Sequence, residues 1–402
     1  MGEIEEYFES FLKKKPLFRD KKLLQSDFMP SEIEHREEQV KSVAEILAPS
    51  LRLEKPSNLF IYGKTGSGKT LTIKHTINKI KTIAHTKNIP ILSVYVNCKL
   101  KKVADTEYRL IAEFIRKLGG EVPSTGLPTE EVYKIFFNII DSKKQLILLI
   151  LDEIDQLVDK VGDEVLYSLT RINSDLKNSQ ISFVGISNDL MFVNTLDPRI
   201  KSSLSEEELV FPPYNAEQLS DILKKRATLA FSENSIGEGV VERCAALAAR
   251  EHGDARRALE LLRVAGEVAE RQGLSKLDLE CLEKAETKIE KDRVIDSIEF
   301  QPKQFHSVLY SIFHINENEN RNLIHTGEVY DVYKDLCNKI NLRPLTQRRV
   351  SDIIGELDML GIINAKTISK GRYGRTRDIS LSVPDSLKVK IDEILKSKLN
   401  FT

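Results

Sequence analysis

The stretch GKTGSGKT, residues 63–70, most constrains how this chain can fold. It follows the apolar run LFIY and precedes the helix-forming segment LTIKHTINKIKTI. The pattern G-x-x-x-x-G-K-[ST] between a strand and a helix is typical of a phosphate-binding loop, because glycine lets backbone N–H groups converge on phosphate oxygens beside a helix N-terminus. A glycine-rich turn without a ligand is the alternative. The flanking strand and helix favour the phosphate-binding loop, so the sequence predicts a nucleotide site.

The residues of this loop contribute differently to nucleotide binding. Lys69 places a positive charge on the β- and γ-phosphates, and the Thr70 hydroxyl is a ligand for Mg²⁺. The expected cofactors are therefore ATP or ADP together with Mg²⁺. The predicted binding residues of the loop are Gly63, Thr65, Gly66, Ser67, Gly68, Lys69 and Thr70.

Polar residues end two later strand candidates, where ligands of open α/β sheets bind. The apolar run LILLILDEID ends in acids that an apolar core would not tolerate. Asp152 is predicted to hold Mg²⁺ and Glu153 to act as the general base toward water. Asp155 is interpreted as a solvated helix-capping acid. Asn188 of GISND is predicted to hold the lytic water or the γ-phosphate, although an isolated Asn at this place would more often be a turn residue.

The segment GDARRAL (253–259) predicts the start of another helix near the nucleotide. Asp254 is the expected N-cap. Arg256 and Arg257 follow it and point about 100° apart on a helix, so only one of them can face the nucleotide. The other is expected to be solvated, and a merely soluble helix face is the alternative for both.

The chain divides into regions of different pattern. Residues 59–211 alternate apolar strand candidates with helical stretches, which predicts a parallel sheet covered by helices. Residues 215–299 carry apolar residues at helical spacing only. A polar break near residues 299–304 opens a third region, mostly helical, with two short strand-like runs near its end. The predicted domains are an N-terminal extension (1–28), an α/β core (29–213), a helical domain (214–299) and a C-terminal domain (300–402).

Composition excludes several classes of protein. The 402 residues carry a net charge of −1, so any nucleic-acid signal must be local. The longest purely apolar run, Leu146 to Leu151, is far shorter than the ~20 residues that span a bilayer. No two of the four cysteines have CxxC spacing, which favours reduced cysteines over a zinc site or disulfides. We expect a cytoplasmic, nucleoid-associated protein with no membrane contact.

The segment LTQRRVSDIIGELDMLGII (345–363) predicts a recognition helix near the C-terminus. Thr346 is the expected N-cap. Gln347 and Arg348 lie off the apolar face at the first turn, where a helix in a major groove contacts base edges. The apolar face consists of Val350, Ile353, Ile354, Leu357 and Leu360.

The following segment, KTISKGRYGRTRDISL, predicts a two-stranded wing with a basic tip. Between residues 343 and 377 there are eight basic residues and three acidic ones. That local excess is typical of a face that binds nucleic-acid phosphates, although a charge run is often only a solvated surface. The predicted DNA-binding residues are Gln347, Arg348, Arg349, Lys370, Arg372, Arg375 and Arg377.

The ordered set GKTGSGKT, LDEID, ISN, FPPY and GDARRAL, followed by a winged-helix pattern, resembles the ORC-type replication initiators of archaea. These are AAA+ ATPases related to eukaryotic origin-recognition subunits and to the helicase-loading factor. The resemblance covers the chain from MPSEIEHREEQ (29–39) to RDISL (377–381). It implies an AAA+ core with a parallel sheet, a helical lid and a C-terminal winged-helix domain. The stretch 98–140 is similar to the helical insert of the initiators.

The resemblance also implies roles for single residues. Arg256 would sense the γ-phosphate from the lid, and Tyr214 of PPY would pack near the adenine. Arg226 on the first lid helix would reach the nucleotide, and His35 and Arg36 of EHREEQ would line the base pocket. Without the family, Tyr214 also fits interdomain core, and Arg226 and His35 fit the surface.

One position departs from the family pattern. Many relatives in the eukaryotic branch carry an arginine before F-x-P-Y that reaches a neighbour's ATP, whereas this sequence has Ser203 there. Arg199 is the arginine nearby, and it fits a structural role as well. Activation of the ATPase by a neighbouring subunit is therefore in doubt.

The resemblance implies a replication initiator that binds double-stranded origin DNA through its winged helix and its insert. ATP binding and slow hydrolysis would switch its conformation, and the replicative helicase and paralogous initiators would be its protein partners. A paralogous AAA+ helix-turn-helix regulator of transcription or replication is the alternative, because every motif would remain intact in it. A clamp-loader-like subunit is a third class, which the basic wing and the insert disfavour.

Overall fold

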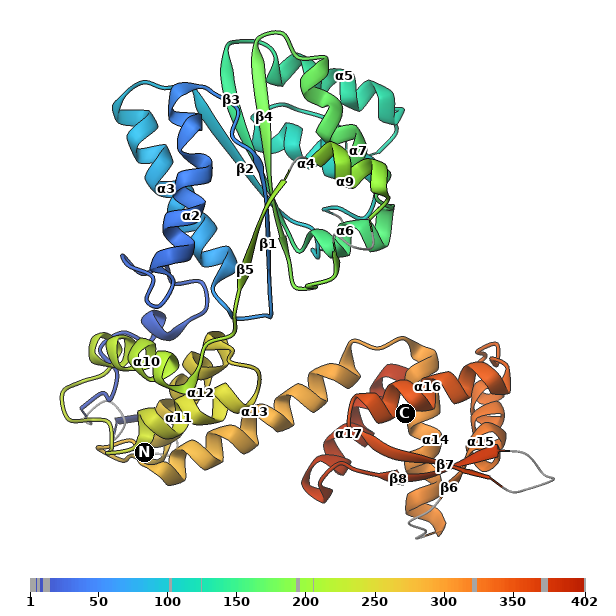
Figure 1. The fold of residues 1–402 in the computed structure, drawn as a ribbon. Coiled ribbons are helices and arrows are strands. Elements are labelled where there is room, and N and C mark those ends of the chain that lie inside the picture. The colour runs from blue at the N-terminus through green and yellow to red at the C-terminus, as the bar shows by residue number, and fades with distance from the viewer. Residues whose placement is uncertain are drawn as a thin grey trace. The chain divides into compact units, whose positions relative to one another are not determined.

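The chain forms two compact units, Met1–Leu282 and Glu283–Thr402 (Figure 1). The division falls inside one long helix, α13 (Leu279–Glu299). The first unit joins the sheet to the helical domain that follows it, and the second unit holds the C-terminal domain. This computed structural model describes residues 5, 8–9, 15–100, 103–123, 125–192, 196–204, 206–319, 324–369 and 375–400.

A five-stranded parallel sheet with the strand order β2-β3-β4-β1-β5 forms the centre of the first unit. Its strands are β1 (Asn58–Gly63), β2 (Ile91–Asn97), β3 (Gln145–Asp152), β4 (Ser179–Ser187) and β5 (Glu206–Phe211). Strand β3 is buried along its whole length, as the continuous apolar runs predict for a sheet covered on both faces. The predicted α/β class with a parallel sheet is confirmed.

Helices cover both faces of this sheet. They are α2 (Glu37–Leu47), α3 (Lys69–Thr86), α4 (Glu107–Lys117), α5 (Thr129–Ile140), α6 (Ile154–Val161), α7 (Glu164–Arg171) and α9 (Pro198–Leu204), with single 3₁₀ turns η2 (Ala48–Arg52) and η3 (Ile172–Ser174). Figure 1 shows α2 and α3 on one face and α4, α5, α6, α7 and α9 on the opposite face. Alternate side chains of β3 point to opposite faces of the sheet. Leu148 packs with α2 and α3, and Leu149 packs with the helices on the other face.

The stretch 98–140, expected to be a helical insert, contains α4 and α5. Thr106 caps α4 by accepting a hydrogen bond from the N–H of Arg109. Phe114 and Phe136 pack with their ring centroids 5.8 Å apart, and both side chains are fully buried. The insert is therefore part of the hydrophobic core of the first unit.

A helical lid follows the sheet. It consists of α10 (Ala216–Ala230), α11 (Val240–Arg250) and α12 (Ala255–Gln272), and continues into α13. Asn215 and Gln218 form a capping box at the start of α10. Asp254 caps α12 by accepting from the backbone N–H groups of Arg256 and Arg257, as predicted.

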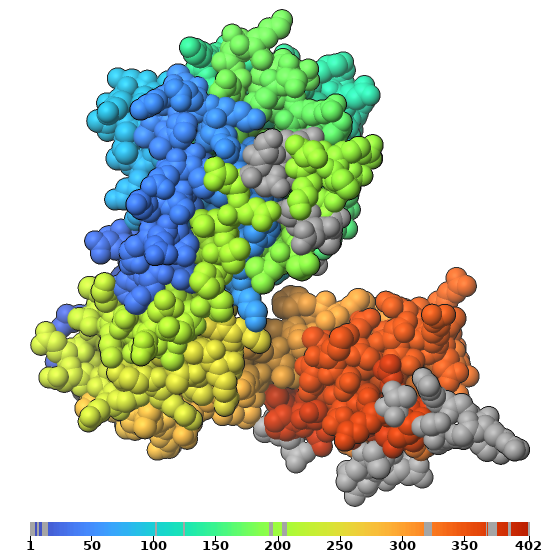
Figure 2. Space-filling model, viewed as in Figure 1, coloured from blue at the N-terminus to red at the C-terminus, as the bar shows by residue number. Residues whose placement is uncertain are grey.

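A strap of residues 15–34, which we call the N-terminal strap, packs on the lid and contains one 3₁₀ turn, η1 (Lys21–Leu24). The Phe18 and Phe231 rings lie with centroids 4.4 Å apart, and the N–H groups of Arg19 and Asp20 both donate to the carbonyl of Ala230. In Figure 2 the blue surface of the N-terminal part meets the yellow-green lid. Part of the predicted N-terminal extension is thus integral to the first unit.

The second unit is a winged-helix domain. Its elements are α14 (Lys303–Glu319), β6 (Ile324–His325), α15 (Thr326–Lys339), α16 (Gln347–Met359), β7 (Ile363–Ser369), β8 (Arg375–Leu381) and α17 (Asp385–Leu399). The strands form an antiparallel sheet in the order β6-β8-β7. Val350, Ile354 and Leu357 of α16 are buried in the core of this unit. The helices α14–α16 followed by the antiparallel strands β7 and β8 confirm the predicted winged-helix class. No helix among the described residues is long and apolar enough to span a membrane.

Candidate nucleotide site and nucleic-acid interface

A cavity of about 370 Å³ opens beside the glycine-rich loop. The loop, the start of α3, the N-terminal strap, α10 and the start of α12 all line it. Gly66, Gly68 and Thr70 are among the polar lining, whereas Phe28 and Leu229 add apolar surface of the kind that accepts a planar base. The combination fits a nucleotide.

Two glycines of the loop are required by the backbone and by close neighbours. Gly66 and Gly68 have φ angles of 74° and 93°, in the left-handed region that favours glycine. A Cβ atom on Gly66 would lie 1.8 Å from the Asp254 carboxylate, and one on Gly68 would lie 2.8 Å from the Tyr214 hydroxyl. Thr65 is exposed. The loop is therefore shaped as much by the lid as by its own sequence.

Lys69 is buried and tightly hydrogen-bonded. Its Nζ donates to the carbonyls of Gly63 and Lys64 at 2.7 and 2.9 Å and to Oδ1 of Asn188 at 2.9 Å. Burial lowers the pKa of Lys69 to about 8, because the nearby Asp152 carboxylate offsets only part of the cost of desolvation. Nearby, the Ser67 hydroxyl is buried without a hydrogen-bond partner among the described residues. Both groups fit a site that receives phosphate oxygens.

Thr70 and Asp152, the two predicted Mg²⁺ ligands, contact each other. The Thr70 hydroxyl donates to Oδ2 of Asp152 at 2.9 Å, across α3 and β3. Hydroxyl and carboxylate oxygens are the ligands that Mg²⁺ prefers. The Ser67 hydroxyl, unpaired among the described residues, and the buried Lys69 lie nearby. Together with them, the Thr70 hydroxyl and the Asp152 carboxylate fit a nucleotide-bound Mg²⁺ ion.

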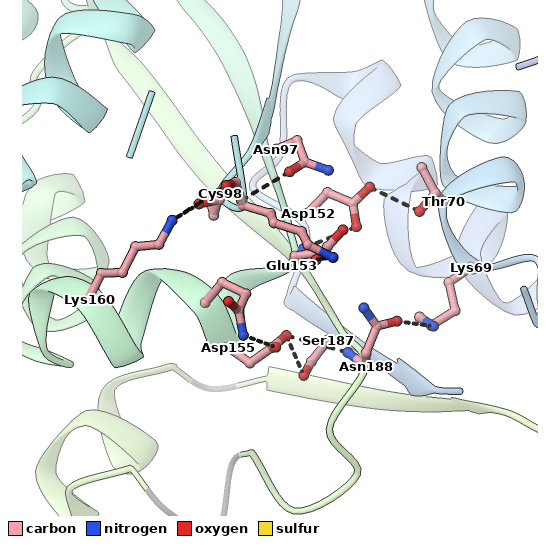
Figure 3. Close-up of polar contacts among 12 residues, drawn as sticks. Lys69, Thr70, Asn97, Cys98, Asp152, Glu153, Asp155, Lys160, Ser187 and Asn188 are labelled. Atoms are coloured by element: carbon pink, nitrogen blue, oxygen red, sulfur yellow. Dashed lines mark hydrogen bonds and ion pairs between the residues drawn. The ribbon is translucent and has the colours of Figure 1, made fainter. Parts of the chain in front are cut away.

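Glu153 and Asn188 stand at the ends of adjacent strands (Figure 3). Glu153 has a left-handed backbone, φ 56° and ψ 49°, of the strained kind that is common at functional sites. Its carboxylate lies 3.5 Å from Nζ of Lys99. Asp155, expected to be solvated, instead accepts from the Ser187 hydroxyl at 2.9 Å and from the Asn188 N–H at 3.4 Å, because the next strand brings these donors over it. It orients Asn188.

The two lid arginines point to different surroundings. Arg256 is exposed and lines the cavity. Arg257, expected to be solvated, is buried, and its Nε donates to Glu251 at 3.2 Å. The prediction for Arg257 was wrong because the inner face of α12 packs against α11, and Glu251, the residue directly after α11, supplies the carboxylate next to it.

Tyr214 lines the cavity, but His35 and Arg36 do not. Arg36 is 2% exposed; its guanidinium lies 3.8 Å from the centre of the Tyr214 ring and donates to the carbonyl of Ser67. His35 faces Asp221 at 3.1 Å. The role expected for both is therefore corrected: the residues just before them line the cavity, and Arg36 braces the loop from behind.

Arg226 lines the cavity, as expected. Its guanidinium, however, is already hydrogen-bonded within the protein. Its guanidinium donates to the carbonyl of Leu23 at 3.1 Å and lies 4.4 Å from the centre of the Phe28 ring. The N-terminal strap thus supplies cavity residues that the sequence analysis missed. The apolar pair Phe28-Met29, outside any expected helix or strand, was the available signal.

Arg199 forms a local ion pair with Asp197 at 3.1 Å, and its side chain is 84% exposed. Ser203, at the place of the family arginine, lies in α9. The pairing agrees with the structural role that the sequence left open for Arg199.

The first turn of α16 presents its polar residues to solvent. Thr346 caps the helix, as predicted, by accepting from the N–H of Arg349. Gln347 and Arg348 are exposed. Arg349 is also exposed and lies 3.6 Å from Asp352. Leu360, expected on the apolar face, is 39% exposed because the helix ends there.

Arg377 differs from the other basic residues of the wing. Its guanidinium donates to the carbonyl of Ser351 at 3.1 Å and would touch a side chain added at Gly355. It therefore fastens β8 to α16, whereas the sequence analysis placed it among the DNA-binding residues. Arg375 begins β8. Lys370 and Arg372 lie outside the described residues.

Comparisons with known proteins agree with this arrangement. Residues 52–190 match the AAA domain family, residues 220–287 the Cdc6 AAA+ ATPase-type lid domain, and residues 296–390 the CDC6 C-terminal winged helix domain. The ORC1-type DNA replication protein of Pyrococcus horikoshii is 52% identical over 384 residues, which cover 94% of this chain and 91% of that protein. The ORC1-type DNA replication protein 1 of Sulfurisphaera tokodaii is 50% identical over 402 residues, covering 99% and 98%.

Among solved structures, the ORC1 protein of Aeropyrum pernix in complex with DNA has a TM-score of 0.85 to this chain. It is 42% identical, and the match covers 96% of this chain and 98% of that protein. The ORC2 protein of the same organism, with ADPNP and ADP, shares the fold at 22% identity and a TM-score of 0.61. From the identity over nearly the whole length, this chain belongs to the family of ORC1-type DNA replication proteins.

Proposed function

We propose that this protein is an ATP-dependent initiator of DNA replication. It binds double-stranded origin DNA, uses ATP binding and slow hydrolysis as a conformational switch, and assists recruitment of the replicative helicase. The observation that carries the proposal is the meeting of loop and lid at one cavity: the N–H of Ala255 donates to the carbonyl of Gly66 at 3.3 Å, next to Arg256.

The nucleotide would be held by the loop and processed at the strand ends. Thr70 and Asp152 would hold Mg²⁺, which neutralises phosphate charge when bound. Lys69 would turn from its present oxygen partners toward the phosphates. Glu153 would take the proton of the attacking water, and Asn188 would orient that water.

The switch follows from the position of the lid. Arg256 at the start of α12 would contact a γ-phosphate in ATP and lose that contact in ADP. Because Asp254 caps the same helix beside Gly66, any shift of α12 is passed to the loop. Slow hydrolysis is favoured because Ser203 stands where many relatives carry the arginine that reaches a neighbour's ATP.

DNA binding is proposed for the winged helix and for the insert. The exposed Gln347 and Arg348 stand where a recognition helix contacts bases. The related ORC1 protein of Aeropyrum pernix was solved with DNA. Lys99 and Leu100, which begin the insert, are exposed and would form a second contact.

A salt titration of DNA affinity tests the proposed DNA contacts of the wing. Each phosphate neutralised by an arginine contributes about 0.9 to the slope of log affinity against log salt. Replacing Arg372 and Arg375 with Ala should flatten that slope by roughly two units and leave ATPase activity intact. Replacing Lys339 and Lys390, two exposed lysines of the same unit, removes equal charge and serves as the control. An unchanged slope in the arginine variant would move the DNA contact to the insert.

Chromatin mapping separates the initiator from the regulator. An initiator is expected at replication start sites, and depletion should delay helicase arrival there. Enrichment at promoters alone, with normal helicase arrival after depletion, would favour the regulator and refute the proposal.

A further inference from the structure

Tyr95 of β2 contacts the metal end of the nucleotide site, although neither motif of that site contains it. Its hydroxyl donates to Oδ2 of Asp152 at 2.5 Å. The Thr70 hydroxyl donates to the same oxygen at 2.9 Å. The contact arises from the sheet, because β2 is the neighbour of β3 and Asn97, two residues after Tyr95, pairs in register with Asp152.

The Asp152 carboxylate is held by three donors. Besides the two hydroxyls on Oδ2, the N–H of Glu153 donates to Oδ1 at 3.0 Å. Asp152 is only 5% exposed, so its carboxylate is solvated mainly by these three donors and hardly by bulk water. Of the two side-chain donors, only the Thr70 hydroxyl belongs to the loop that grips the nucleotide.

The Tyr95 ring is itself held in place by α3. Nζ of Lys74 lies 4.4 Å from the centre of the ring. Lys74 follows Thr70 by four residues, so both lie on the same side of α3, and both line the cavity. The phenol is therefore clamped between the helix that follows the loop and the strand that carries the acid.

We propose that Tyr95 is a positioning residue that orients the Asp152 carboxylate for Mg²⁺. This inference rests on the proposed function. Hydrogen bonds to ligand carboxylates fix their orientation, and losing such a partner commonly costs roughly 10–100-fold in metal affinity. Replacing Tyr95 with Phe removes the hydrogen bond to Asp152 and keeps the ring beside Lys74, so the change should spare the contacts to the nucleotide.

Nucleotide binding with and without the metal tests this inference. Wild type and Tyr95→Phe are titrated with a fluorescent ATP analogue, in EDTA and at increasing MgCl₂. We expect the half-saturating Mg²⁺ concentration to rise roughly 10-fold in the variant, and the affinity in EDTA to stay unchanged. Tyr133→Phe is the matched control, because it removes a tyrosine–carboxylate hydrogen bond (2.7 Å to Glu107) inside the insert, and should match wild type.

A double variant shows whether Tyr95 acts through Asp152. In an Asp152→Asn background, Tyr95→Phe should add little to the Mg²⁺ requirement, since the group it orients is already altered. Equal loss of affinity in EDTA and in Mg²⁺, or an unchanged Mg²⁺ requirement in a folded Tyr95→Phe protein, would overturn the inference. Wild type that binds no ATP analogue in either buffer would instead refute the proposed function, on which this inference rests.

Discussion

The nucleotide cradle, by which we mean residues 63–70 with Asp152, Glu153, Asn188 and Arg256, and the exposed side of α16 both depend on charged side chains. In the cradle, Lys69 and Asp152 are each 5% exposed and each engaged in three hydrogen bonds. On α16, Arg349 is 58% exposed, and its carboxylate neighbours Asp352 and Glu356 are 3.6 and 3.9 Å away.

This difference in exposure determines how the charged side chains act in each region. Buried charges interact strongly and cannot be removed without leaving a partner unsatisfied, so the cradle depends on geometry. Exposed pairs contribute about 0–1 kcal/mol and are screened by salt. A face of that kind gains affinity by summing many phosphate contacts. Single substitutions should therefore be severe in the cradle and graded on the winged helix.

The largest expected effect is that of Glu153→Gln. Loss of a general base lowers the rate by roughly 100-fold or more. ATP should remain bound, since this residue is assigned to the water and not to the phosphates. Single-turnover hydrolysis, with affinity measured in parallel, checks this, and Asp159→Asn on the exposed side of α6 is the control. Hydrolysis at the wild-type rate would show that another residue is the base.

Lys69→Ala should weaken ATP binding by roughly 100-fold, because one partner of a buried charge contact is lost. The pKa of about 8 adds a signature in pH. Only the charged lysine attracts phosphate, so affinity should be full below pH 8 and decline as pH rises above that value. Titrating ATP binding between pH 7 and about 9.5 tests it. Lys81→Ala, on the exposed side of α3, should behave as wild type. A decline of equal steepness in Lys69→Ala would assign the titration elsewhere.

Arg348→Ala tests the reading side of α16. Discrimination between specific and random duplexes should fall by ~1–3 kcal/mol if the guanidinium pairs with a base. ATPase activity should be unchanged, because the nucleotide cradle lies in the other unit. Competition binding at fixed salt measures the ratio, with Lys339→Ala as the control. Equal losses on all sequences would make Arg348 a phosphate contact.

Arg377→Ala should have the smallest effect on DNA binding. The lost hydrogen bond to Ser351 should reduce the free energy of unfolding of the winged helix by about 1 kcal/mol. The salt slope of DNA affinity should not change. Thermal unfolding together with the salt titration checks both, and Arg348→Ala, which is exposed, should leave unfolding unaffected. A flatter slope would return Arg377 to the phosphate-binding set.

The sequence by itself determined the sheet, the glycine-rich loop and the helix caps. These features follow from local chemistry: β3 is apolar because both its faces are buried, Gly66 and Gly68 need left-handed backbone, and Asp254 caps the helix that it precedes. The apolar face of α16 was predictable for the same reason, except at Leu360, where the helix ends.

Only the tertiary structure decided the partners of the long polar side chains. Arg36, Arg226, Arg257 and Arg377 carry the same group, yet one braces the loop, one holds the N-terminal strap, one is buried beside Glu251 and one fastens the wing. Tyr95 and Asp152 are likewise far apart in sequence. A guanidinium or phenol reaches several ångströms from its backbone, so its partner depends on which remote segment packs beside it, and no local pattern carries that information.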